Sequence, residues 1–192
     1  MSHSEQYRGH TIRIEPDTDA ESPHEWDNLG VMTCFHKRYA LGDKTELKSS
    51  DFDSWEELRK HLEKEGAEVI LPIFMFDHSG LTLATSSERF RACDSQGWDW
   101  GQVGFIWITR EKILSEYGWK RITKARRDKI CGYLDGEVKT YSQYLEGDVY
   151  GYVIETEDGE EDSCWGFYGQ DEALAEAKGI VDYKVNASSV PV

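Results

Sequence analysis

Apolar residues along this chain recur at two spacings, one typical of strands and one typical of helices. Apolar residues three or four positions apart, a spacing typical of helices, occur in three segments. Two of these segments begin after Ser54 and after Thr109, and the third extends from Thr123 to about Leu145. Short alternating or continuous apolar runs, typical of strands, separate these segments. They occupy residues 7–15, 26–36, 67–76, 81–85, 98–108, 148–155 and 163–168.

Residues at the ends of these segments support the assignment. Ser54 followed by Glu57 forms a capping box, which is typical of a helix start. Pro72 interrupts the run 67–76 and predicts either an edge strand or a bulge there. The tetrapeptide Asp77-His78-Ser79-Gly80 predicts the turn of a hairpin.

The remaining segments are shorter. We expect a polar loop over residues 86–97, a short helix over 171–178 and a last strand over 180–185, with loose tails at 1–6 and 187–192. Consecutive strands joined by short turns favour antiparallel pairing. The sequence therefore predicts an α+β fold, with residues 1–192 as a single domain. Its sheet would be mostly antiparallel, with about six strands, and would pack with three to four helices.

The stretch 98–108 is the most distinctive part of the pattern. It begins Trp98-Asp99-Trp100-Gly101 and continues as an apolar run to Ile108. A similar order, Trp26-Asp27 followed by Gly30, precedes the run that ends near residue 36. Asp can cap a turn, Gly accepts a positive φ and Trp can cover the turn. We expect the two turns to meet at one end of the sheet.

Composition narrows the class of protein. The 192 residues include 37 acidic and 22 basic side chains, giving a net charge of -15. Such a charge argues against direct binding to nucleic acid or to an anionic membrane, because both would repel it. It permits binding to basic proteins, although solubility is the simpler interpretation.

The N-terminal residues, the apolar runs and the cysteines indicate where the protein acts and whether it holds a structural metal. The N-terminal residues lack the apolar core of a secretory signal, and no apolar run is long enough to span a membrane. The four cysteines contain no CxxC pair, which argues against a structural zinc site. Free thiols in a reducing cytoplasm are the simplest interpretation.

The charge is uneven along the chain. Residues 110–129 carry eight basic and three acidic side chains, whereas residues 135–176 carry thirteen acids and one lysine. The basic segment could bind a phosphate-bearing ligand or an acidic partner, or could simply be a solvated face. The acidic block could imitate the phosphates of nucleic acid and occupy a basic groove. The candidate partner-binding residues are Glu155, Glu157, Asp158, Glu160, Glu161, Asp162, Asp171 and Glu172.

A ligand pocket is the other possible site. Its candidate lining residues are Trp26, Asp27, His36, Asp77, His78, Trp98, Asp99 and Trp100. Carboxylate and imidazole groups suit zinc or manganese, but no HxxxH or HExxH spacing supports a metal. Cys34 lies two residues before His36, so a thiolate is conceivable, although a core cysteine is the simpler interpretation. We therefore assign no catalytic residue, cofactor or metal.

Five motifs stand out together: Trp26-Asp27-Asn28-Leu29-Gly30, Cys34-Phe35-His36-Lys37-Arg38-Tyr39-x-Leu41-Gly42-Asp43, Asp77-His78-Ser79-Gly80, Trp100-Gly101-Gln102-Val103-Gly104-Phe105-Ile106 and Tyr141-x-x-Tyr144-Leu145-x-Gly147-Asp148-Val149-Tyr150-Gly151. As a set they resemble those of a family of uncharacterised proteins encoded by bacteriophages and mobile elements. The resemblance covers most of residues 24–154 and departs at Trp100, where the family has Ser. Because the family has no established activity, no functional residue carries over.

Two functions remain open. The resemblance implies a mobile-element setting, in which small acidic proteins often block host defence. The favoured hypothesis is therefore an acidic binding protein that acts in the host cytoplasm, with enzymatic activity left open but not favoured. It would occupy the nucleic-acid groove of a CRISPR or restriction complex. The alternative is a small ligand- or metal-binding enzyme with a Trp-lined pocket.

Overall fold

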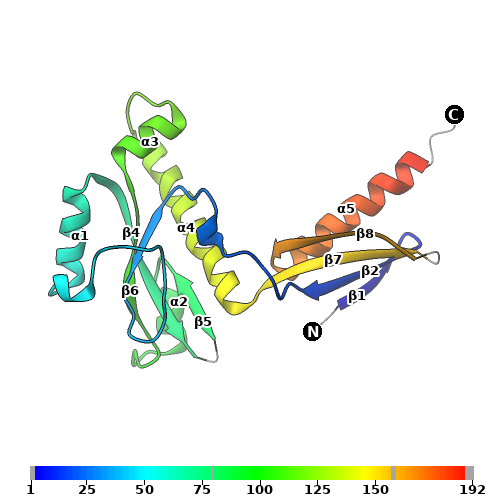
Figure 1. The fold of residues 1–192 in the computed structure, drawn as a ribbon, viewed down its shortest axis with the longest axis horizontal. Helices are drawn as coiled ribbons and strands as arrows, with labels where there is room; N and C mark the ends of the chain where they lie inside the picture. The colour runs from blue at the N-terminus through cyan, green and yellow to red at the C-terminus, as the bar shows by residue number, and fades with distance from the viewer. Residues whose placement is uncertain (1–2, 79, 157–158, 189–192) are drawn as a thin grey trace. The chain divides into compact units, whose positions relative to one another are not determined.

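The chain folds into two compact units, each built on one four-stranded antiparallel sheet (Figure 1). The computed structural model describes residues 3–78, 80–156 and 159–188. Residues 1–22 and 143–192 form the terminal unit, and residues 23–142 form the inserted unit. The α+β class is confirmed, but the sequence predicted one sheet of about six strands where there are two sheets of four. That both units belong to a single domain stays a prediction.

The terminal unit pairs its strands in the order β1-β2-β7-β8. The strands are β1 (His3–Tyr7), β2 (His10–Pro16), β7 (Val149–Thr156) and β8 (Gly159–Tyr168), and α5 (Gln170–Ser188) packs on the sheet. Side chains alternate between the two faces of a strand, so one face collects the apolar residues that α5 buries. This core contains Ile12, Ile14, Tyr152, Ile154, Ala173, Ala177 and Val181.

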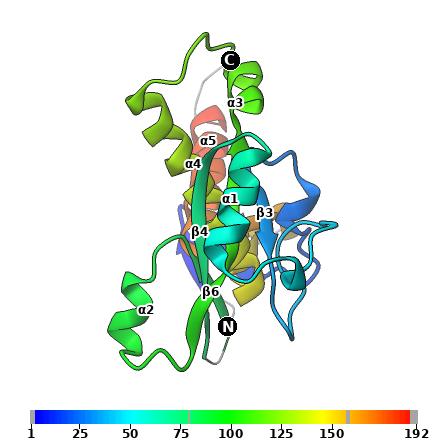
Figure 2. The same ribbon diagram turned by 90° about the vertical axis from the view of Figure 1, so that its left-hand side faces the viewer.

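The inserted unit has the strand order β3-β6-β4-β5. Its strands are β3 (Val31–Cys34), β4 (Ala67–Asp77), β5 (Leu81–Ala84) and β6 (Trp100–Thr109). Helix α1 (Trp55–Lys64) covers one face of this sheet, and α4 (Lys124–Glu146) lies on the other (Figures 1 and 2). Two short helices, α2 (Glu88–Cys93) and α3 (Arg110–Tyr117), and two 3-10 turns, η1 (Pro23–Glu25) and η2 (Ser49–Asp51), complete the unit.

Local chemistry sets the helix starts as the sequence predicts. The Ser54 hydroxyl accepts the Glu57 N–H at 3.3 Å, and the Glu57 carboxylate accepts the Asp53 N–H at 2.8 Å. Thr109 caps α3 in the same way, through a 3.1 Å bond from the Lys112 N–H. These side chains satisfy backbone donors that have no partner inside the helix.

Pro72 lies where β4 has a neighbour on one side. β6 pairs with β4 along its length, whereas β5 pairs only with residues 74–77 of β4. The strand is therefore locally an edge at Pro72, and its register shifts between Ile73 and Phe74. The predicted edge position is confirmed, as is the hairpin that joins β4 to β5.

Three predictions about local structure are wrong. Residues 3–7 form β1 instead of a loose tail, and the polar loop 86–97 contains α2. Residues 180–185 continue α5 instead of forming a strand, because the four-residue spacing of Ala173 and Ala177 extends to Val181. No helix in the ranges 3–78, 80–156 and 159–188 is both long enough and apolar enough to cross a membrane.

Candidate functional site

The two Trp-Asp turns lie at opposite ends of the inserted unit's sheet. Trp26-Asp27 precedes β3, and Trp98-Asp99 precedes β6. These strands are antiparallel, with Val31 opposite Trp107, so their starts are at opposite ends. The expectation that the two turns meet is wrong, and the eight candidate pocket residues do not line one cavity.

Six of the eight, all except Trp26 and Asp27, lie near the start of β6. His78 Nδ1 lies 2.9 Å from Asp99 Oδ2, and the Asp77 N–H donates to the Asp99 carbonyl at 2.8 Å. The Asp77 carboxylate forms an ion pair with Arg38 and accepts the Tyr39 hydroxyl at 3.2 Å. These contacts fasten the end of the β4–β5 hairpin to the loop before β6.

His36 stacks on Tyr39 with ring centroids 5.0 Å apart. The side chains of His78 and Asp99 are 68% and 41% exposed, whereas that of Asp77 is 24% exposed. Within the part of the chain that the structure describes, no three His, Cys, Asp or Glu side chains are grouped to hold a metal ion.

The two tryptophans of this turn have different environments. Trp98 is 86% exposed, whereas Trp100 packs on Phe74 and donates its indole N–H to the Asp94 carbonyl at 2.8 Å. The cap of the turn is Asp94, whose carboxylate accepts the N–H groups of residues 96, 97 and 99. These hydrogen bonds lower the pKa of the Asp94 carboxyl, and the bond from the Asp99 N–H has the largest effect. The sequence pointed to Asp99 for this role.

Cys34 is a core residue. Burial, with a smaller contribution from the Asp43 charge, raises the pKa of its thiol to about 12. The thiol is therefore protonated at neutral pH, whereas a nucleophilic cysteine requires a thiolate. The hypothesis of a thiolate activated by His36 is contradicted.

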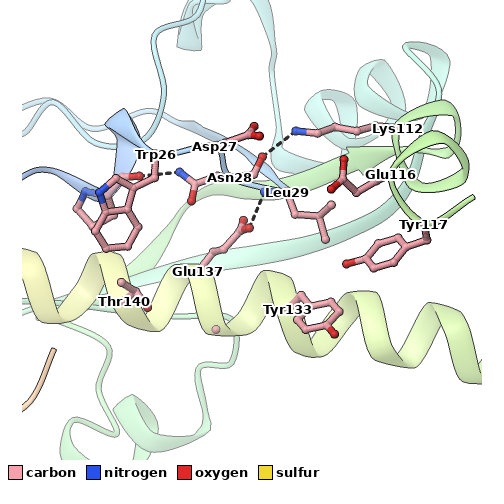
Figure 3. Close-up of a pocket in the computed structure, with 12 residues that line it drawn as sticks. Trp26, Asp27, Asn28, Leu29, Lys112, Glu116, Tyr117, Tyr133, Glu137 and Thr140 are labelled. Atoms are coloured by element: carbon pink, nitrogen blue, oxygen red, sulfur yellow. Dashed lines mark hydrogen bonds between the residues drawn. The ribbon is translucent and has the colours of Figure 1, made fainter. Parts of the chain in front are cut away.

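A cavity of about 380 Å³ lies at the opposite end of the same sheet, near the start of β3 (Figure 3). The loop before β3, helix α3 and helix α4 line it, and it is open to solvent on one side. Glu137 on α4 accepts the N–H groups of Leu29 at 2.6 Å and Gly30 at 2.9 Å. From α3, Lys112 Nζ donates to the Asn28 carbonyl at 2.7 Å. These bonds fix the loop above the cavity.

The cavity combines aromatic rings with acidic groups. Trp26, Tyr117 and Tyr133 contribute the rings, and Asp27 and Glu116 add carboxylates to that of Glu137. Only Trp26 and Asp27 were candidates from the sequence. The lining residues on α3 and α4 were not among the candidates, because only tertiary packing brings them to the loop.

The terminal unit carries most of the charge. It contains 17 acidic and four basic residues, for a net -13 out of -15. Each of the four cations lies near a carboxylate of the same unit. The ion pairs are Arg8–Asp182 at 3.1 Å, Arg13–Glu155 at 3.1 Å, Lys178–Glu5 at 2.8 Å and Lys184–Asp162 at 3.3 Å.

The predicted partner-binding residues therefore differ in environment. Glu155 and Asp162 are engaged in ion pairs, and Asp171 and Glu172 are exposed in the first turn of α5. Glu157 and Asp158, together with the side chains of Glu160 and Glu161, lie outside the described residues.

Acidic residues from three distant segments meet at one end of the terminal unit's sheet. The Asp17 N–H donates to the Val149 carbonyl at 2.8 Å, and the Gly169 N–H donates to the Asp148 carbonyl at 3.0 Å. These bonds join the end of β2, the start of β7 and the start of α5. We call this group the acidic end; its members are Asp17, Asp19, Glu21, Asp148, Asp171 and Glu172.

The acidic end influences a nearby tyrosine. Burial raises the pKa of Tyr168, and the neighbouring Tyr144, Asp17 and Glu21 raise it further. Asp17, Asp19 and Glu21 are not among the partner-binding residues predicted from the sequence, because the β2–β7 pairing that places them is not visible in local patterns.

Two exposed aromatic side chains belong to the same unit. Trp165 is 46% exposed and Tyr183 is 75% exposed. The Trp165 ring lies across Gly151, where an added Cβ would meet it at 2.2 Å. Gly151 alternates with the core residue Tyr152, so Trp165 is on the sheet face opposite α5.

Comparison of the chain with protein-family models, with curated proteins and with solved structures finds no match.

Proposed function

We propose that this protein binds a basic protein surface that otherwise holds nucleic acid, and that its terminal unit makes the contact. The observation that carries the proposal is the concentration of a net charge of -13 in this unit, against -2 in the inserted unit. A dense array of fixed negative charge attracts the same lysine and arginine side chains that bind phosphates.

The acidic end supplies the anionic part of this surface. Asp19, Glu21, Asp171 and Glu172 are exposed there. Their carboxylates are carried on backbone that hydrogen bonds hold between the ends of β2, β7 and α5. Charges placed on an ordered backbone lose little entropy when they meet a partner.

The exposed aromatics of the same unit supply binding energy that charge alone does not. Tryptophan and tyrosine are the residues most enriched among those that dominate protein interfaces. Trp165 and Tyr183 offer large apolar areas, each with a polar group for a hydrogen bond. Binding would therefore fall with salt but keep an apolar component.

The resemblance to mobile-element proteins suggests the biological setting. In a bacterial host, the basic surface would belong to a defence complex such as a CRISPR effector or a restriction enzyme. Inhibition would follow from competition for the nucleic-acid groove. This account needs no catalytic residue, no cofactor, no direct contact with nucleic acid and no membrane.

Competition with DNA is the property that tests the proposal. Proteins from a bacterial lysate are bound to DNA-cellulose and then eluted with this protein at constant salt. Serum albumin at the same concentration is the acidic control. We expect this protein to release a small set of DNA-binding proteins and to remain bound to them. Release equal to that by albumin would contradict the proposal.

A further inference from the structure

We propose that the cavity beside Glu137 binds an organic cation, namely an ammonium or guanidinium group carried on a short apolar stem. The cavity belongs entirely to the inserted unit, so this inference does not depend on the proposed function. Its volume of about 380 Å³ is within the range of small-ligand sites.

The charge of the lining favours a cation. Asp27, Glu116 and Glu137 contribute three carboxylates, and Lys112 contributes the one ammonium. The Lys112 ammonium already donates to the Asn28 carbonyl. The Glu137 carboxylate accepts two backbone N–H groups, which leaves about two of its four acceptor positions for a ligand.

The aromatic rings favour the same class of ligand. Trp26 and Tyr133 are each 43% exposed, and the face of an aromatic ring attracts cations. The Lys129 ammonium of the protein itself already lies close to two of these rings. Lys129 Nζ lies 5.4 Å from the ring centroid of Tyr133 and 5.9 Å from that of Tyr117. With Lys129 included, the three carboxylates still outnumber the two ammonium groups.

Gly136 leaves room for the apolar stem. It lines the cavity on α4, and an added Cβ would meet nothing within 4 Å. Glycine inside a helix is less favourable than alanine, and the open space at the Cβ position shows that packing does not require glycine here. A larger side chain there would occupy the cavity without a clash at its Cβ.

The same helix provides a matched control. Gly132 also has no heavy atom within 4 Å of an added Cβ, but it is not a lining residue of the cavity. The substitutions Gly136→Leu and Gly132→Leu change helix propensity equally, and only the first fills the cavity. Glu116→Gln removes one exposed lining charge and gives a second, independent variant.

The experiment measures binding of n-butylammonium and n-butylguanidinium by calorimetry, with n-butanol and butyrate as neutral and anionic probes. We expect the cations to bind with a Kd of about 1 mM, as suits a ligand with few atoms. Binding of n-butanol or butyrate should be at least tenfold weaker. Gly136→Leu should weaken cation binding at least tenfold and Glu116→Gln at least threefold, while Gly132→Leu changes it less than twofold.

Two further probes distinguish the source of the cation. Tighter binding of spermidine would assign the cavity to a free amine, and tighter binding of capped lysine or arginine amides would assign it to a protein side chain. Either result supports an organic cation. Equal binding of n-butanol and n-butylammonium, or equal binding to the Gly136→Leu and Gly132→Leu variants, would overturn the proposal.

Discussion

The Glu137 carboxylate holds the Leu29 backbone N–H at 2.6 Å, which ties α4 to the loop before β3. A second bond, at 2.9 Å, comes from the Gly30 N–H. Gly30 is buried, and an added Cβ there would lie 2.7 Å from Ile106 and Leu134. The loop, the sheet and α4 are therefore tightly joined at this point.

Replacement of Glu137 should destabilise this junction. An amide in the Glu137→Gln variant cannot accept both backbone N–H groups. We expect the free energy of unfolding to fall by about 1–3 kcal/mol, as for the loss of a hydrogen bond to a charged group. Urea denaturation followed by circular dichroism measures this. Glu116→Gln, an exposed change in the same cavity, should alter stability by less than about 0.5 kcal/mol. Equal losses in both variants would contradict the role of Glu137.

Gly151 is required by the ring of Trp165. A methyl group at this position would overlap the ring, so Gly151→Ala should displace the indole and cost about 1–3 kcal/mol. Gly179→Ala on α5 is the matched change, since its added Cβ meets no atom within 4 Å. That variant should gain up to about 1 kcal/mol from helix propensity. Thermal unfolding of both proteins would show opposite shifts in Tm; a stabilised Gly151→Ala variant would contradict the packing.

Asp43 makes the inserted unit sensitive to acid. Burial alone would raise the pKa of this carboxyl. Hydrogen bonds from His24 and the Met32 N–H, with the charges of His24 and Lys112, outweigh burial and lower it. A pKa that is lower in the folded state gives stability that is complete above about pH 4 and is lost as pH falls through the folded pKa.

The measurement compares wild type with Asp43→Asn by urea unfolding between pH 7 and pH 3. The variant should be less stable at pH 7, because the His24 contact at 2.8 Å and the Met32 bond at 2.7 Å are weakened. It should also lose less stability on acidification. Parallel curves for the two proteins would show that Asp43 does not titrate as described.

The four thiols should differ in reactivity. Cys93 and Cys164 are exposed, whereas Cys34 is buried and has a pKa raised to about 12. With iodoacetamide at pH 8, Cys93 and Cys164 should be alkylated at least tenfold faster than Cys34, as mass spectrometry of the peptides would show. In urea, Cys34 should react as fast as the others. Fast alkylation of Cys34 in the folded protein would restore it as a candidate nucleophile.

Features that depend on neighbouring residues could be predicted from the sequence. The caps at Ser54 and Thr109 need only three residues each, and both hairpins, β4–β5 and β7–β8, join strands close in sequence. β1 could not be predicted, because its residues HSEQY are polar and contact the sheet only along an edge.

The sites depend on pairings between distant segments. The Trp26 and Trp98 turns share local chemistry, yet antiparallel pairing of β3 with β6 separates them. Conversely, Asp17 and Asp148 are far apart in sequence, and the pairing of β2 with β7 brings their segments together. Sequence patterns therefore identified an acidic chain and some of the relevant residues, but not which residues share a surface.

The most direct test of the central claim compares two variants that neutralise four acids each. One changes the exposed residues of the acidic end, Asp19 and Asp171 to Asn with Glu21 and Glu172 to Gln. The control changes Glu46, Glu56, Glu63 and Glu65 of the inserted unit to Gln. All four glutamates are exposed, and their replacement changes the net charge of the protein by the same amount as in the first variant.

Both variants are used to elute host proteins from DNA-cellulose at one salt concentration. We expect the control variant to release the same proteins as wild type, with at most a twofold loss. The variant of the acidic end should require at least tenfold more protein for the same release. Equal activity of the two variants, or loss in the control alone, would contradict the claim that the terminal unit binds the basic partner.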